Sequence, residues 1–333
     1  MFEQLVIIGE GESGDVYCAD TTFFDKSLTA NVKIEKVAVK LVRLSDSTED
    51  ASALRLEHMP HEITLWRSCA HAHILPVYEC FYEPDVGIWI TQELMDRSLA
   101  DILAVRPSGV EMSERHISRV ITDVLSGLEF LHSKRIMHRD CRSDNVMIGS
   151  DGVAKLSDFT HACKLEDKRR SVVGTPFWMA PEVIKAAPYD YKADIWSLGV
   201  VLYEMVEGDP PRIELPPLSA ITLTATVGLP PLRNPDACSP ELRQFLAWCT
   251  EMEPDNRPFS EMLVNVSLCF FFLLKSLITD SVSPAERILI GPLRAFGHRH
   301  SSRASPRCRS RYSRRRVHEF GRRDGHGTAL CAA

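Results

Sequence analysis

Several features are scarce or missing in this chain of 333 residues, and each absence excludes a class of protein. The ten cysteines include no C-x-x-C pair and no regular spacing, which indicates reduced thiols and excludes a disulfide framework. The first residues have no signal-peptide pattern, because glycines and charges interrupt their apolar positions. We therefore expect a cytoplasmic protein, with the nucleus as the alternative compartment.

A hydrophobic run long enough to cross a bilayer is also missing. The segment from Val264 to Ile278 is apolar, but Asn265, Ser267 and Lys275 interrupt it. A transmembrane helix needs roughly 20 apolar residues. We therefore interpret the segment as an atypical end of the folded domain, in preference to a membrane anchor.

Lysine is absent from residues 287–333, which hold 12 arginines and only two acids, Glu319 and Asp324. The net charge of this segment is +10, whereas that of the whole chain is −6. From His298 to Arg316 serine alternates with arginine without an apolar period, so we expect a disordered tail over residues 280–333. Such a tail could contact nucleic acid or an acidic lipid, or it could have no evolved role.

The order of the expected elements indicates the fold class. Strand patterns come first, over residues 5–8, 15–19, 36–42, 76–82 and 87–92, with one helical pattern over 49–69. Helical patterns dominate afterwards, over residues 113–132, 193–207 and 241–251. This order predicts an α+β protein with a small antiparallel-sheet lobe over 1–92, carrying one helix, and a larger, mainly helical lobe over 93–279.

The first motif is a glycine-rich turn between two strands, Gly9-Glu10-Gly11-Glu12-Ser13-Gly14-Asp15-Val16. Glycines let the backbone approach a polyphosphate closely and present N–H groups to its oxygens. No helix follows the turn, which argues against a dinucleotide-binding fingerprint. Alone the motif is a weak signal, because many glycine-rich hairpins bind nothing.

A lysine at the end of the next strand strengthens the interpretation. Lys40 ends Val37-Ala38-Val39-Lys40, from which an ammonium can reach phosphate oxygens if a carboxylate holds it. We choose Glu62 as that carboxylate, and Glu57 is the alternative because Pro60 blurs the helical register. Each residue alone could equally form a surface salt bridge worth at most about 1 kcal/mol.

Three further motifs follow in order. In His138-Arg139-Asp140-Cys141-Arg142-Ser143-Asp144-Asn145, Asp140 can accept the hydrogen bond of an incoming hydroxyl and Asn145 can bind a metal ion. Asp158-Phe159-Thr160 offers a second metal-binding carboxylate, and Ala180-Pro181-Glu182 closes the intervening segment. A chance match to every motif in this order and spacing is implausible.

Together these motifs resemble the eukaryotic protein kinases over residues 5 to about 262. Within that superfamily the chain is most similar to the PAK kinases of the sterile-twenty group. The supporting stretches are Gly174-Thr175-Pro176-Phe177-Trp178-Met179-Ala180-Pro181-Glu182, Lys192-Ala193-Asp194-Ile195-Trp196-Ser197-Leu198-Gly199 and Glu204-Met205-Val206-Glu207-Gly208-Asp209-Pro210-Pro211. The resemblance implies the two-lobed kinase fold and transfer of the ATP γ-phosphoryl group to protein hydroxyls.

By position, the resemblance also implies a role for each matching residue, with ATP and Mg²⁺ as cofactors. Catalysis would depend on Asp140, Lys40, Glu62, Arg142 and Thr175. The nucleotide would lie against Gly9, Gly11, Gly14, Val16, Ala38, Lys40, Gln92, Glu93, Met95 and Met147. The metal ligands would be Asn145 and Asp158, and a stacked spine would join Trp66, Tyr78, Phe159 and His138. Glu182 would pair with Arg257, and Asp194 would anchor the catalytic loop.

Regulation and substrate choice are also implied. Ser171 matches the PAK activation-loop phosphothreonine, and its phosphate could pair with Arg139, although an unmodified serine is the alternative. Asp144 predicts substrates with Arg or Lys near the phosphoacceptor. We expect no GTPase-binding regulatory segment of the PAK kind within these 333 residues, and no motif in them identifies an upstream activator.

Two positions depart from the family pattern. Thr160 replaces a glycine, and since a β-branched residue resists positive φ we expect a stiffened metal motif. Arg142 stands where Ser/Thr kinases have lysine, and its planar guanidinium keeps the positive charge. Some tyrosine kinases also have arginine at this position. We expect an active Ser/Thr protein kinase, and the alternative is a nucleotide-binding pseudokinase or scaffold with little turnover.

Overall fold

The computed structural model describes residues 2–11, 14–21, 36–43, 62–83, 86–106 and 112–265. The predictions that concern Glu57, the apolar segment beyond Asn265 and the tail over 280–333 lie outside these residues. Within them, no helix is both long and apolar enough to span a membrane.

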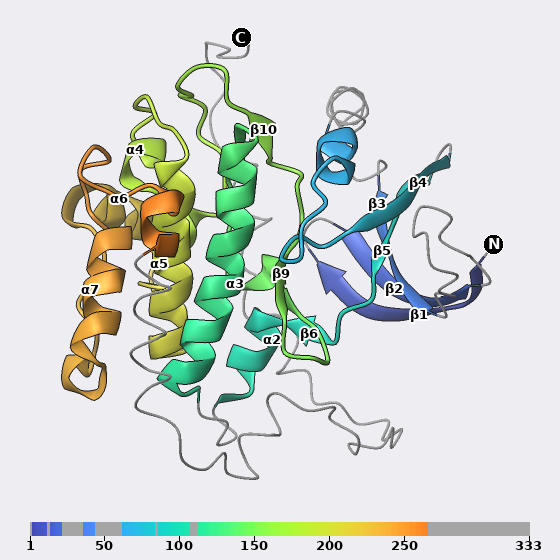
Figure 1. Cartoon of the computed structure of the whole chain (residues 1–333), viewed down its shortest axis with the longest axis horizontal. Helices are drawn as coiled ribbons and strands as arrows, with labels where there is room; N and C mark the ends of the chain where they lie inside the picture. Colours follow the sequence, from blue (N-terminus) through green and yellow to red (C-terminus); the bar gives the residue numbers. More distant parts are fainter. Residues whose placement is uncertain are drawn as a thin grey trace.

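A five-stranded antiparallel sheet forms the smaller part of the molecule, on the right in Figure 1. Its strands are β1 (Phe2–Gly11), β2 (Gly14–Thr21), β3 (Lys36–Arg43), β4 (Val77–Glu83) and β5 (Gly87–Glu93), in the spatial order β1-β2-β3-β5-β4. The central β3 is rich in valine and buried from Val37 to Val42, as expected for a strand covered on both faces. Residues 62–67 form a helical stretch beside the sheet.

The register of this sheet brings the glycine-rich turn beside Lys40. Gly9 pairs with Val16, and Val16 pairs in turn with Lys40. At Gly14 φ is +136°, and a Cβ there would lie 2.1 Å from the carbonyl oxygen of Leu41. Only glycine can occupy this position, because any side chain would collide with the backbone of β3.

Helices form the larger part, on the left in Figure 1. They are α2 (Leu99–Ala104), α3 (Glu114–Ser133), α4 (Pro181–Ile184), α5 (Lys192–Glu207), α6 (Pro217–Val227) and α7 (Pro240–Cys249). Ser98 starts α2 with a capping box that includes Asp101, which satisfies free amides of the first turn. Helix α5 is buried along nearly its whole length, so it is the centre of this lobe.

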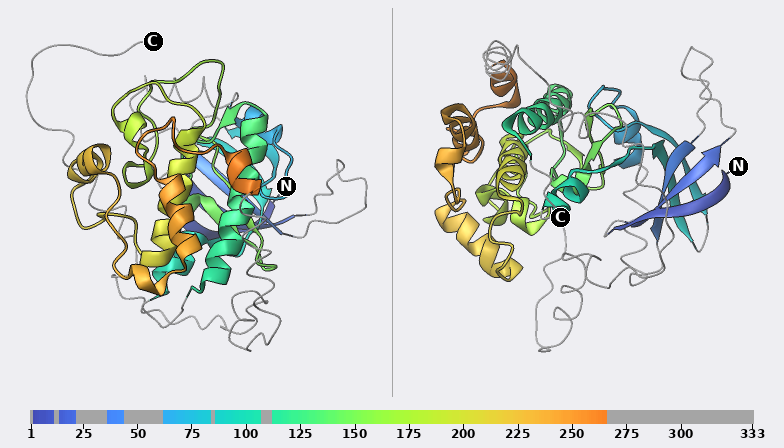
Figure 2. Two further views of the ribbon diagram at one scale, coloured as in Figure 1. Left: turned by 60° about the vertical axis from the view of Figure 1, so that its left-hand side comes forward. Right: turned by 90° about the horizontal axis from the view of Figure 1, so that it is seen from below.

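Short strands fix the loops between the two parts. Strands β6 (Arg97–Ser98), β8 (Val146–Ile148) and β9 (Ala154–Leu156) form one small sheet, and β7 (Ile136–Met137) pairs with β10 (Cys163–Lys164). Single 3-10 turns occur at Ser143–Asn145, Pro176–Trp178 and Pro235–Ala237. The loops at 138–145 and 157–162 therefore start and end on paired strands. Seen from below, the strands of the five-stranded sheet lie on one side of the helices (Figure 2). The predicted α+β, two-lobed fold is confirmed.

Candidate active site

The loop that carries Asp140 is anchored on helix α5. The fully buried Asp194 accepts hydrogen bonds from the backbone amides of His138 at 2.9 Å and Arg139 at 2.7 Å. His132 Nε2 lies 2.9 Å from the same carboxylate. Burial alone would raise the pKa of Asp194, but these contacts outweigh it and lower the pKa. The ionised carboxylate holds Arg139 in a left-handed conformation with φ +66°, which turns the chain toward the site.

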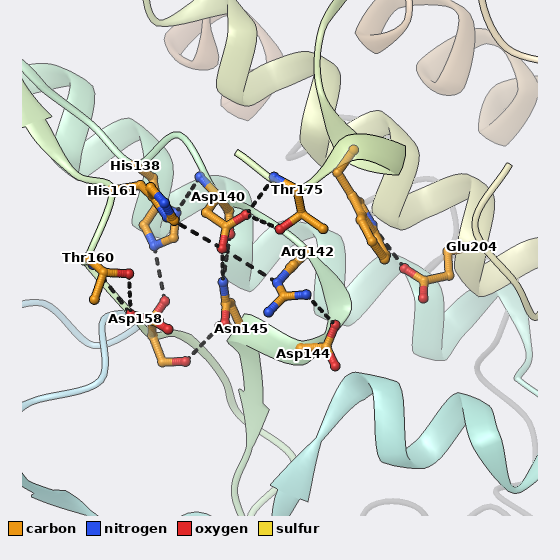
Figure 3. A network of polar contacts seen from close by, with 12 residues as sticks. His138, Asp140, Arg142, Asp144, Asn145, Asp158, Thr160, His161, Thr175 and Glu204 are labelled. Atoms are coloured by element: carbon orange, nitrogen blue, oxygen red, sulfur yellow. Dashed lines mark hydrogen bonds and ion pairs between the residues drawn. The ribbon is translucent and has the colours of Figure 1, made fainter. Parts of the chain in front are cut away.

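Asp140 is held through both of its carboxylate oxygens. Oδ1 accepts hydrogen bonds from the Thr175 hydroxyl at 2.7 Å and from the Thr175 amide at 3.2 Å. Oδ2 accepts one from Asn145 Nδ2 at 2.9 Å (Figure 3). Thr175 reaches Asp140 because Gly174 has φ +123°, where a Cβ would lie 2.8 Å from the carbonyl oxygen of Arg139. A carboxylate fixed in this way can take the proton of an incoming hydroxyl.

The two predicted metal ligands supply oxygen atoms. Asn145 Nδ2 also donates to the carbonyl oxygen of Asp140 at 2.8 Å, which turns its Oδ1 away from that residue. Asp158 offers a carboxylate at a positive φ of 61°. Among the described residues, no group of three or more His, Cys, Asp or Glu could hold a metal unaided. Two oxygen donors suit Mg²⁺, which keeps water and phosphate oxygens as its remaining ligands.

Lys40 contacts the metal motif directly. Its Nζ donates to Asp158 Oδ2 at 3.0 Å, and both side chains are at least nine-tenths buried. The lysine is therefore held by a carboxylate 118 positions away in the chain, a partner that the sequence did not identify. Glu62 lies in the helical stretch over 62–67, and its pairing with Lys40 stays a prediction.

We expected Thr160 to stiffen the metal motif by resisting positive φ, but the structure does not require positive φ at this position. The positive φ of this motif occurs at Asp158, and Thr160 is not among the described residues with positive φ. Its hydroxyl donates to Asp158 Oδ1 at 2.9 Å, and its amide is 3.3 Å from the same oxygen. The threonine hydroxyl therefore adds a hydrogen bond that orients the Asp158 carboxylate. The left-handed residue of the turn is Asp158 itself, and aspartate tolerates this conformation.

The predicted nucleotide-binding residues lie on neighbouring strands. Ala38 pairs with Gln92 across β3 and β5, and Gln92 is buried with no hydrogen-bond partner for its Oε1 among the described residues. Glu93, at the end of β5, forms an ion pair with Lys155 of β9. Met95 is buried and Met147 of β8 packs against the core. Gly11 ends β1 and pairs with Gly14 at the start of β2.

An aromatic stack connects the small helix to the catalytic loop. The rings of Trp66 and Phe159 are stacked 5.2 Å apart, and the ring of His138 meets Phe159 edge-on at 5.1 Å. Burial lowers the pKa of His138, which keeps this ring neutral within the stack. Tyr78 packs against the sheet cluster of Ala19, Val37 and Val39.

Arg142 reaches two acids of its own loop. Its Nε is 3.5 Å from Asp140 Oδ2, and its Nη1 is 3.3 Å from Asp144 Oδ2. The Arg142 side chain is 15% exposed, whereas that of Asp144 is 45% exposed. A fixed positive charge thus lies beside Asp140, and the carboxylate of Asp144 beyond it is open to solvent.

Ser171 lies beside the catalytic loop. Arg139 Nη1 is 3.3 Å from Ser171 Oγ, and the Tyr189 hydroxyl donates to the Ser171 carbonyl at 2.8 Å. Arg139 also donates from Nε to the carbonyl oxygen of His161 at 2.6 Å. The same guanidinium therefore contacts both the segment that carries Ser171 and the segment after Asp158.

Glu204 is an important buried residue that sequence reasoning missed. Ser143 Oγ donates to its Oε1 at 2.6 Å, and Trp178 Nε1 donates to its Oε2 at 3.1 Å. These contacts join the catalytic loop to the segment after Thr175. Burial raises the pKa of Glu204 to about 8, although both hydrogen bonds act in the opposite direction. A single glutamate within a helical stretch carries no sequence signal for this environment.

The raised pKa of Glu204 predicts a pH-dependent stability. A carboxyl group whose pKa is higher in the folded state stabilises the protein at low pH, and this stability is lost as pH rises through the folded pKa. We expect Glu204→Gln, a neutral isostere, to gain stability relative to wild type as pH rises from about 5 to about 9. Urea denaturation across this range measures the difference, and Glu207→Gln on the same helix is the control. If the unfolding free energies of wild type and Glu204→Gln changed in parallel with pH, Glu204 would be ionised over the whole range tested.

Comparisons with known proteins agree with this geometry. The sequence profile of the protein kinase domain matches residues 2–268. The chain is 35% identical over 262 residues to serine/threonine-protein kinase pakC of Dictyostelium discoideum, covering 78% of this chain and 51% of that protein. It is 37% identical over 268 residues to serine/threonine-protein kinase STE20 of Saccharomyces cerevisiae, covering 79% of this chain and 26% of that protein. The chain thus spans from about a quarter to about half of these relatives.

Proposed function

The chain belongs to the protein kinase family, in its PAK-like, sterile-twenty group, and we propose that it transfers the γ-phosphoryl group of Mg-ATP to serine and threonine hydroxyls of proteins. The observation that carries this proposal is the doubly held carboxylate of Asp140. Thr175 and Asn145 leave it little freedom, so it can orient a hydroxyl for in-line attack.

Each charge that phosphoryl transfer needs is present near this carboxylate. Lys40 contacts Asp158, so the phosphate-binding lysine and a metal-binding carboxylate are neighbours. Arg142 contributes a permanent positive charge beside Asp140. Asn145 and Asp158 would hold Mg²⁺, which would supply positive charge to neutralise the charge that develops during transfer. These groups favour catalysis over the alternative of a pseudokinase or scaffold.

The identity of the phosphoacceptor is the first point to test. The purified chain should transfer labelled phosphate from Mg-ATP to a basic generic substrate, and hydrolysis of the product should release phosphoserine and phosphothreonine. Thr175, which contacts Asp140, supports serine and threonine as acceptors. An arginine at the position of Arg142 also occurs in some tyrosine kinases, so the acceptor needs a direct test. Labelled phosphotyrosine as the main product would contradict it.

Substrate preference is expected to follow the exposed carboxylate of Asp144. Arg142 engages one face of Asp144, and the side chain remains 45% exposed. A basic residue near the phosphoacceptor can approach that exposed carboxylate, which supports a preference for Arg or Lys in the substrate.

Ser171 is expected to act as an activating phosphorylation site. A phosphate on its Oγ would add about −2 charge beside Arg139, whose guanidinium is already 3.3 Å away. We expect phosphorylated protein to be about tenfold more active than Ser171→Ala, which corresponds to an ordinary coupling energy. Phosphate occupancy by mass spectrometry, compared with activity, measures the effect, and exposed Ser133→Ala serves as the control. Equal activity at full and at zero occupancy would exclude the switch.

A further inference from the structure

His161, which no sequence motif singled out, faces the Asp140 carboxylate. It lies in the turn between β9 and β10, and its Nδ1 is 3.9 Å from Asp140 Oδ2 (Figure 3). This nitrogen is buried and has no hydrogen-bond partner among the described residues, although 43% of the side chain is exposed. Buried ring nitrogens are rarely left unsatisfied, so its position points to a transient partner.

The backbone around His161 is held firmly. Its carbonyl oxygen accepts the hydrogen bond from Arg139 Nε at 2.6 Å. The next amide, that of Ala162, donates to the carbonyl oxygen of Phe159 at 2.9 Å and closes the turn. The turn that presents Asp158 therefore also sets the position of His161 relative to Asp140.

The donors around Asp140 determine where a proton can go. Two donors from Thr175 occupy Oδ1, so a proton taken from the substrate binds Oδ2. Three described nitrogens surround Oδ2: Asn145 Nδ2 at 2.9 Å, Arg142 Nε at 3.5 Å and His161 Nδ1 at 3.9 Å. An amide nitrogen and a guanidinium cannot accept a proton. A neutral imidazole can, which leaves His161 Nδ1 as the acceptor in this group.

We propose that His161 takes from Asp140 the proton that the phosphoacceptor hydroxyl releases and passes it to water. As the hydroxyl oxygen bonds to phosphorus, ADP leaves with the electron pair of the broken P–O bond and the hydroxyl proton binds Asp140 Oδ2. That proton then moves to His161 Nδ1, and the proton on Nε2 passes to water. Exchange with water then returns the ring to the tautomer that carries its proton on Nε2, so Nδ1 can accept again. The carboxylate is thereby restored for the next turnover.

The distance is compatible with this step. The 3.9 Å between Nδ1 and Oδ2 must shorten by about 1 Å, and catalytic hydrogen bonds are often long before substrate binds. His161 acts through Asp140, so it is a positioning residue for the reaction and not a group that touches the phosphate. The inference rests on the proposed kinase function.

The test compares His161→Gln and His161→Ala with wild type under saturating Mg-ATP and a basic substrate. We expect kcat to fall about tenfold, a modest share of general acid–base catalysis, with the KM for ATP unchanged. Added imidazole should raise the rate of His161→Ala toward that of wild type, and it should leave the rates of wild type and Asp140→Asn unchanged. The matched control is His71→Gln, since His71 stacks on Phe130 in another part of the chain.

The outcomes separate this inference from the proposed function. Wild-type rates in both His161 variants, beside an inactive Asp140→Asn, would overturn the proton role and leave the kinase assignment standing. His161→Ala could also have a lower rate that imidazole does not restore, with the melting temperature and ATP affinity of wild type. That result would overturn the proton role too, because the ring would then contribute only through its packing. Activity in Asp140→Asn equal to wild type would remove both.

Discussion

Asp140→Asn is expected to lose about 10²–10⁴-fold in the rate of phosphoryl transfer, the usual contribution of a general base. The amide that replaces the carboxylate cannot take a proton, and its NH₂ group would face either the donors of Thr175 or that of Asn145. Nucleotide affinity should change little, because the Lys40–Asp158 contact does not include Asp140. Single-turnover transfer of labelled phosphate and calorimetric ATP binding measure the two quantities separately.

Asp151→Asn is the matched control for this experiment. Asp151 is exposed and accepts a hydrogen bond from the Val153 amide in the turn between β8 and β9. The same chemical change there should leave transfer at the wild-type rate. If Asp140→Asn incorporated phosphate as fast as Asp151→Asn, the enzymatic assignment would be wrong.

Arg257→Ala is expected to destabilise the fold by about 3–5 kcal/mol, the cost of removing one partner of a buried ion pair. Arg257 has no exposed side-chain surface, and its guanidinium donates to both oxygens of Glu182, at 2.6 and 3.2 Å. It also donates to the carbonyl oxygens of Lys192 at 2.8 Å and Glu251 at 2.8 Å, and lies 5.2 Å from the centre of the Trp196 ring. The truncation therefore leaves a buried carboxylate without its cation and removes the guanidinium donors from two carbonyl oxygens.

Urea denaturation of Arg257→Ala, compared with exposed Arg243→Ala on α7, measures this effect. A double variant, Glu182→Gln with Arg257→Ala, should recover part of the lost free energy, because the uncompensated charge is then gone. A destabilisation of Arg257→Ala no larger than that of Arg243→Ala would mean that the pair is solvated in solution.

The motif residues could be identified from sequence because their spacing reflects a local requirement. A glycine-rich turn needs its glycines in one hairpin, and the loop with Asp140 and Asn145 is one short segment between β7 and β8. The predicted helix over 113–132 and the observed α3, Glu114–Ser133, differ by one residue at each end. An apolar period and a capping serine, Ser113, define both ends locally.

Residues without a local signal were missed or interpreted wrongly. Thr160 was expected to stiffen its turn by resisting positive φ, but the left-handed residue of the turn is Asp158, a difference that depends on the backbone path. The environment of Glu204 and the approach of His161 to Asp140 arise from segments that meet only in the folded protein. No periodicity or spacing in the chain records such meetings.

The sequence by itself determined the family, the order of the lobes and the set of charged groups available for phosphoryl transfer. Only the tertiary structure decided how several of these groups and their neighbours are paired: Lys40 with Asp158, Thr175 with Asp140, Ser143 with Glu204. The physical reason is the separation along the chain over which each kind of interaction acts. Helix periods, turns and caps act over a few residues, whereas the hydrogen bonds that set the reactivity of a carboxylate join atoms within about 3 Å from distant parts of the chain.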